Sequence, residues 1–198
     1  GTLTVNGDLT MAQGTTFDAE FGAGGAGDKV VVGGNLALNG VTLNIADAGG
    51  MGPGVYNLFS YGGTLTTTNG GLLLLGTQPA GRGISLQTLV GQKKINLIDY
   101  TNVTLNYWNA NRLASPTQMG GGDGTWSNTA STWTDAQGVF TAPMNPQPGF
   151  AIFGGANGTV TVDGTAGAVG VTGMQFLSDG YRITGDALDL VSPSGPAI

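Results

Sequence analysis

The chain has 198 residues, of which 38 are glycine, 40% are hydrophobic and only 9% are charged. Such a chain is too apolar and too weakly charged for intrinsic disorder, and its length fits one domain or one segment of a longer array. The net charge of −6, with six basic residues, excludes the basic stripe that nucleic-acid binding requires. The same charge argues against an anionic membrane surface as a partner.

The chain contains no cysteine and no histidine. Disulfides, thiol catalysis and thiolate metal sites are therefore excluded, and so is a Ser–His–Asp triad. Histidine, the commonest general base and the commonest transition-metal ligand, is also missing. Abundant Gly and Asn disfavour helix interiors, whereas Thr fits a pleated surface. The composition thus predicts an all-β protein with many tight turns.

Two similar stretches open the chain, TLTVNGDLTMAQGTTFDA at 2–19 and DKVVVGGNLALNGVTLNI at 28–45. Apolar residues alternate with polar ones in both, which places them on one face of short strands. Gly or Asn-Gly between the strands marks turns. The alignment pairs Leu3 with Val30, Val5 with Val32, Leu9 with Leu36, Met11 with Leu38, Thr16 with Thr42 and Phe17 with Leu43.

The same pattern continues along the chain and predicts further short strands. We expect them at 55–59, 64–67, 72–75, 84–86, 95–98, 103–105, 151–153, 159–162, 169–171, 174–176, 182–184 and 188–190. Many short strands fit a sandwich, a barrel or a solenoid. Repetition at a period in the twenties favours a solenoid, in which each turn buries its apolar face against its neighbours.

Residues 107–150 differ from the rest, because the alternation fades there and the segment holds all three tryptophans. We expect a packed loop or a connection between two solenoid segments, since Trp108, Trp126 and Trp133 carry large apolar surfaces that need burial. The predicted organisation is therefore solenoid rungs at 1–106, this connection at 107–150, and further rungs at 151–198.

Few carboxylates come close enough in sequence to suggest chemistry. Asp18 and Glu20 would share the polar face of one strand, an arrangement that glycoside cleavage or Ca²⁺ binding would use. A solvated strand face explains the pair better. Asp186 and Asp189 lie three positions apart and would face opposite ways. We predict no catalytic residue, no cofactor site and no metal site.

Other motifs also have simple structural explanations. GGAGDKV at 24–30 resembles a Ca²⁺ nonapeptide, but Asp28 falls one position early. The glycines at 120–122 precede Asp123 without the Lys and helix of a phosphate loop. Thr64, Thr66 and Thr68 would line a solvent-facing strand.

Two further features are weighed in the same way. Asn102 and Asn157 match the glycosylation acceptor pattern, a match we attribute to chance. Trp126 and Trp133 would stack on a sugar only if exposed, and we expect them to be buried anchors.

Three passages together resemble the passengers of bacterial autotransporters. DKVVVGGNLALNGVTLNI followed by GVYNLFSY at 54–61 resembles the late rungs of pertactin-like passengers. GGGDGTWSNTASTWTDAQG at 120–138 and AIFGGANGTVTVDG at 151–164, leading to GMQFLSDGYRITGDALDL at 173–190, resemble the autotransporter-associated β-strand repeat. The resemblance implies a right-handed parallel β-helix, exported through an outer-membrane barrel and displayed on a Gram-negative cell or secreted. That C-terminal barrel is absent from this chain, so we expect a fragment of a longer passenger.

The resemblance implies a structural and binding role rather than an enzymatic one. We expect a stalk or adhesin whose partner is a host-cell surface, an extracellular-matrix protein or glycan, or another copy. It would reach a membrane only through the absent barrel. Two alternatives remain open: a β-helical enzyme that cleaves polysaccharide with Asp or Glu, and a stalk for a catalytic domain elsewhere in the parent chain.

Overall fold

The computed structural model describes residues 1–68 and 71–192. These residues form β-strands and two short 3₁₀ turns, and they contain no α-helix. The expected all-β class is therefore confirmed. The chain divides into two compact units, Gly1–Thr101 and Asn102–Ile198, which are described one at a time.

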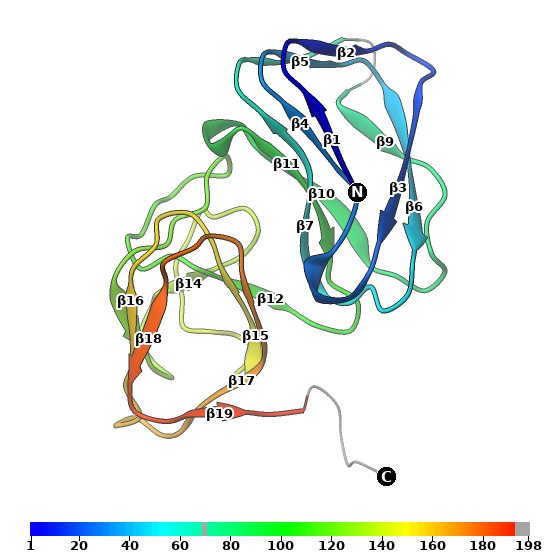
Figure 1. The fold of residues 1–198 in the computed structure, drawn as a ribbon. Helices are drawn as coiled ribbons and strands as arrows, with labels where there is room; N and C mark the ends of the chain where they lie inside the picture. The colour runs from blue at the N-terminus through cyan, green and yellow to red at the C-terminus, as the bar shows by residue number, and fades with distance from the viewer. Residues whose placement is uncertain (69–70, 193–198) are drawn as a thin grey trace. The chain divides into compact units, whose positions relative to one another are not determined.

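Unit 1 builds three sheets, in the strand orders β1-β4-β7-β11-β10, β2-β5-β8 and β3-β6-β9 (Figure 1). The chain runs three times through these sheets in the same sequence, and we call each triplet (β1–β3, β4–β6, β7–β9) a pass. The elements of unit 1 are β1 (Thr2–Val5), β2 (Leu9–Met11), β3 (Thr16–Phe21), η1 (Ala23–Gly25), β4 (Lys29–Val32), β5 (Leu36–Leu38), β6 (Val41–Asp47), β7 (Gly54–Tyr61), β8 (Leu65–Thr67), β9 (Leu73–Leu75), β10 (Ile84–Leu89), η2 (Val90–Gln92) and β11 (Lys94–Asp99).

The first two passes pair in the register that the sequence alignment predicts. Strands β1 and β4, β2 and β5, and β3 and β6 are parallel neighbours. Leu3 faces Val30, Leu9 faces Leu36, and the offset falls from 27 to 26 residues before Thr16 faces Thr42. The remaining three predicted pairs are also neighbours. These pairings confirm the predicted register. The register is fixed because a slip of one residue would turn every apolar side chain from the core to the solvent.

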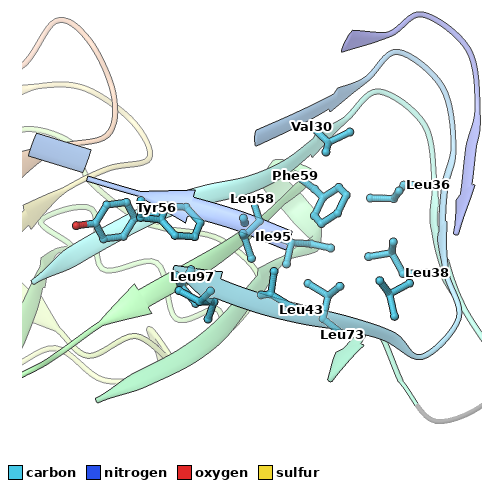
Figure 2. Packing of buried hydrophobic residues seen from close by; sticks show 14 of the residues in the cluster. Val30, Leu36, Leu38, Leu43, Tyr56, Leu58, Phe59, Leu73, Ile95 and Leu97 are labelled. Atoms are coloured by element: carbon cyan, nitrogen blue, oxygen red, sulfur yellow. The ribbon is translucent and has the colours of Figure 1, made fainter. Parts of the chain in front are cut away.

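The core of unit 1 lies between its three sheets. Figure 2 shows side chains from all three sheets pointing toward one another, with Leu36 and Leu38 of β5 opposite residues of β4, β7 and β6. Leu36, Leu38, Leu43, Leu58 and Phe59 are fully buried. The second and third passes therefore contribute apolar side chains from every sheet to one shared core, and the first pass contributes from β2 and β3.

A hairpin ends the parallel pairing in one sheet of unit 1. Strand β11 pairs antiparallel with β7, and β10 pairs antiparallel with β11. Both strands were expected at these positions, yet β11 runs opposite to the strands of the passes, and β10, antiparallel to β11, returns to their direction. Asn57 of β7 donates to Asn96 of β11 (3.1 Å), and Asn96 donates to Gln87 of β10 (3.1 Å), so one half-buried and two buried amides link the three strands.

Unit 2 forms two sheets, in the orders β14-β12-β15-β17-β19 and β13-β16-β18. All neighbours are parallel except β12 and β14. The elements are β12 (Leu105–Trp108), β13 (Gly124–Trp126), β14 (Trp133–Thr134), β15 (Gly149–Phe153), β16 (Thr159–Val162), β17 (Val169–Phe176), β18 (Arg182–Gly185) and β19 (Leu188–Leu190).

Three predicted strands of unit 2 differ from the structure. The strand expected at 103–105 lies at 105–108, because Asn102 adopts a φ of 58° and extends the turn before it. The strands expected at 169–171 and 174–176 join as β17. The first half of β17 pairs with β19 and the second half with β15. The segment 107–150, set apart by its sequence, contains β13, β14, the second half of β12 and the first two residues of β15.

Candidate functional site

Columns of Asp and Asn side chains run along unit 1. In the first, at a corner, Asp8 Oδ1 accepts a hydrogen bond from the backbone N–H of Asn35 (2.6 Å), and Asn35 Oδ1 accepts one from the N–H of Thr64 (2.8 Å). In the second, on strands β3 and β6, the Asn44 side chain donates to Asp18 (2.8 Å) and accepts from the N–H of Thr77 (2.9 Å). Each side chain thus satisfies a donor of the next pass.

Glycines make room for these columns. A Cβ on Gly34 would lie 2.1 Å from Asp8 Oδ1, and one on Gly63 would lie 2.4 Å from Asn35 Oδ1. The hydrogen bonds from Asn35 also lower the pKa of Asp8. The corner pattern Gly-Asp or Gly-Asn is therefore a stacking device, and its polar groups are occupied within the chain.

The structure places the predicted carboxylate pair on a solvated strand face. Asp18 and Glu20 are both exposed on β3, while Ala19 and Phe21 between and beside them are buried. The Asp18 carboxylate is held by Asn44. The expectation of a solvated face is confirmed.

The remaining acidic candidates lie apart and bind backbone donors. Asp28 accepts from the N–H of Glu20 (3.0 Å) and pairs with the amino group of Gly1. Asp186 accepts from the N–H of Gly164 (2.9 Å), and Asp189 is exposed on β19. Within residues 1–68 and 71–192, no three acidic residues come together in a way that would hold a metal ion.

The remaining motifs from the sequence also lie in turns or on the surface. Gly121 and Gly122 have φ of 99° and 87°, which favours glycine at this corner. Asp123 accepts from the N–H of Thr159 (2.6 Å), repeating the corner rule of unit 1. Asn157 donates to the carbonyl of Asp179 (3.2 Å). Thr64, Thr66 and Thr68 are exposed as expected.

The three tryptophans lie inside unit 2. Trp108, Trp126 and Trp133 are each at most 1% exposed, so none of them offers a face for stacking on a sugar. Their rings pack around Phe153, at centroid distances of 5.6–6.0 Å. The expectation of buried anchors is confirmed.

Sequence reasoning missed one ionic cluster. Arg82 bridges Asp47 (2.8 Å) and Asp99 (2.7 Å) and donates to the carbonyl of Met51. Asp99 is fully buried and also accepts from the N–H of Thr101 (2.9 Å). These ion pairs raise the pKa of Arg82 against the opposing effect of burial. The three charges are far apart in sequence, so no local motif reveals them.

Together, these features define an all-β protein built from recurring parallel strands with polar corners. Nearly the whole chain is similar to a small part of a much longer protein. The adhesin BmaC autotransporter of Brucella suis biovar 1 (strain 1330) is 42% identical over 204 residues, which cover 98% of this chain and 6% of the relative. This similarity confirms the predicted family, the autotransporter passengers, and with it a location at the cell surface or outside the cell.

Other comparisons add no relative. No family model matches the chain, and no solved structure matches it. None of the helical segments in the described residues has the length and apolar character needed to cross a bilayer. The chain spans about 6% of the relative's length, so the relative's name describes a much larger protein.

Proposed function

We propose that the passes form a right-handed parallel β-helix. The support is the recurrence of three strands in three sheets with parallel, in-register pairing between passes. A crossover that joins parallel strands of one sheet is right-handed in about 98% of cases. In chain order, passes within 1–106 and 151–198 would flank the Trp-bearing segment 107–150.

This architecture is testable because the chain contains no cysteine. Thr10 and Ala37 are register partners on β2 and β5, and Thr66 is the next partner along. Neighbouring strands lie about 4.8 Å apart, within disulfide reach, whereas two strand spacings exceed the limit of about 7 Å. We expect Thr10→Cys with Ala37→Cys to oxidise readily, and Thr10→Cys with Thr66→Cys to stay reduced. Equal oxidation of both pairs would contradict the stacking, and a crystal structure would test the hand.

We propose that this β-helix acts as a stalk and adhesive surface of an autotransporter passenger, without enzymatic activity. The observation that carries the proposal is the 42% identity, over 98% of the chain, to a protein named an adhesin. Few charges and many outward Thr and Asn side chains suit numerous polar contacts. The partner would be a host-cell surface, a matrix protein or glycan, or another copy of the chain.

Adhesion is tested with beads that carry the purified chain. We expect them to be retained on an epithelial monolayer, or to clump with one another, more than beads that carry albumin. Beads with the heat-unfolded chain control for nonspecific stickiness. Retention and clumping no greater than with albumin would contradict the proposal. Release of reducing sugar from a polysaccharide panel, lost in Asp18→Asn, would instead support the enzyme alternative.

A further inference from the structure

One aromatic side chain of unit 2 is almost wholly exposed. Phe140 is 82% exposed, the highest value for a large hydrophobic side chain among the described residues, and Val139 beside it is 42% exposed. The next highest are Leu190 on β19 and Leu3 on β1, which lie on strands paired on one side only. An added strand would cover those two residues. Phe140 lies on no strand, so missing sheet neighbours do not account for its exposure.

The loop that carries Phe140 is held at its base and along one side. Trp133 and Ala142 exchange two backbone hydrogen bonds (3.0 and 2.8 Å). Inside this closure, Asp135 Oδ1 accepts from the N–H groups of Gln137 and Gly138, both at 3.0 Å. The carbonyl of Gly138 accepts from the N–H of Ser115 (3.0 Å).

Phe140 is therefore presented on a pre-formed loop, because the hydrogen bonds hold the backbone on both sides of the tip. A pre-formed loop loses little conformational entropy when it binds. Rigid aromatic side chains of this kind are typical anchors of protein interfaces, where a few of them supply most of the binding energy.

The net charge of unit 2 selects the kind of partner. No Lys or Arg occurs between Arg112 and Arg182, while unit 2 carries six aspartates. Because unit 2 as a whole is acidic, an anionic bilayer, which attracts basic segments, would repel it. The exposed Phe140 matches instead an apolar pocket whose rim is basic, since complementary potentials steer association.

We propose that Phe140, supported by Val139, is a docking anchor that inserts into an apolar, basic-rimmed pocket of a protein partner. This inference rests on the proposed adhesive function and names the contact through which it acts. Truncation of an anchor of this kind costs about 2 kcal/mol or more, which corresponds to about a 30-fold loss of affinity.

The test compares bead retention on epithelial cells for the unchanged chain, Phe140→Ser and the matched control Leu190→Ser. We expect about a 30-fold loss for Phe140→Ser, little loss for Leu190→Ser, and identical urea unfolding of the three proteins. Trypsin treatment of the cells should remove retention, and added salt should lower it. Vesicles of phosphatidylcholine, with or without phosphatidylserine, should not co-sediment with the chain.

The outcomes separate this inference from the proposed function. Equal retention of the unchanged chain and Phe140→Ser would overturn the anchor while the adhesive function stands. An equal loss for Leu190→Ser would also overturn it, because the effect would then be general hydrophobicity. Phe140-dependent co-sedimentation with either vesicle would overturn the protein pocket. Absence of retention by the unchanged chain would defeat the adhesive function and the anchor together.

Discussion

Phe153 lies at the centre of the aromatic core of unit 2, and its removal should destabilise that unit strongly. The side chain is fully buried. It contacts the rings of all three tryptophans, stacks on Phe176 at 4.9 Å with an interplanar angle of 11°, and packs against Tyr181 at 5.4 Å. Phe→Ala substitutions in cores cost about 3–5 kcal/mol. We expect Phe153→Ala to cost about 4 kcal/mol, since five rings lose a partner.

The tryptophans themselves supply the assay. All three lie in unit 2, so their fluorescence reports the urea unfolding of that unit and not of unit 1. For a unit of this size, the free energy of unfolding falls by roughly 1–1.5 kcal/mol per molar urea. The midpoint for Phe153→Ala should therefore fall by about 3 M, or the unit should be unfolded without urea.

Phe140→Ala is the matched control, because it removes the same atoms from a side chain that is 82% exposed. Its midpoint should lie within the error of the unchanged chain, since surface substitutions usually alter stability by less than about 0.5 kcal/mol. A Phe153→Ala midpoint that moves no further than that of Phe140→Ala would refute the reasoning. It would mean that the ring contacts do not stabilise the unit.

Three further predictions concern the corners, the ionic cluster and pH. Gly34→Ala should cost about 1–3 kcal/mol by circular dichroism melting, because the added Cβ would lie 2.1 Å from the stacked carboxylate, whereas Gly7→Ala, with no atom within 4 Å, should be neutral. Equal melting temperatures of the two variants would refute the claim that the stacked Asp and Asn column stabilises unit 1. Arg82→Met should cost about 3–5 kcal/mol, because it leaves a fully buried carboxylate without its ion pair, and faster amide exchange along β11 would report the loss. Burial raises the pKa of Tyr181 to about 12, above its ordinary 10.0, so the contribution of Tyr181 to the stability of unit 2 should be fully present below pH 10 and be lost as pH rises towards 12. Tyr181→Phe should remove one proton from those released on unfolding in that range, and an unchanged pH slope of tryptophan-detected unfolding would contradict this.

Much of the strand pattern could be predicted from local sequence. Strands β16 and β19 match their predicted bounds, Thr159–Val162 and Leu188–Leu190. The register of the first two passes followed from their alignment. Both passes have the same alternation of apolar and polar residues, and their one-residue difference in length falls in a turn. The burial of the tryptophans followed from their size.

The direction of pairing could not be predicted in this way. Period-2 alternation is the same in a parallel and an antiparallel strand, so the sequences of β10 and β11 carried no sign that they would form a hairpin on β7. Only the length of the connection decides, because a short turn such as η2 returns the chain antiparallel. Strand β14 also pairs antiparallel with β12, although residues 109–132 and strand β13 separate the two in sequence.

The exposed anchor is another feature that sequence reasoning passed over. Phe140 and Trp133 are both aromatic residues of the Trp-bearing segment, and burial was predicted for the tryptophan alone, with no prediction for Phe140. The structure buries Trp133 and exposes Phe140. The difference arises because the backbone pairing of Trp133 with Ala142 turns the intervening residues away from the core.

By itself, the sequence determined the all-β class, the repeat, its register and the glycine corners, because these depend on residues that are neighbours along the chain or aligned by the period. Tertiary structure alone decided the Arg82 cluster, the antiparallel direction of β11 and β14, and the exposure of Phe140. These depend on which segments, distant in sequence, meet in the folded units, and no local pattern encodes that meeting.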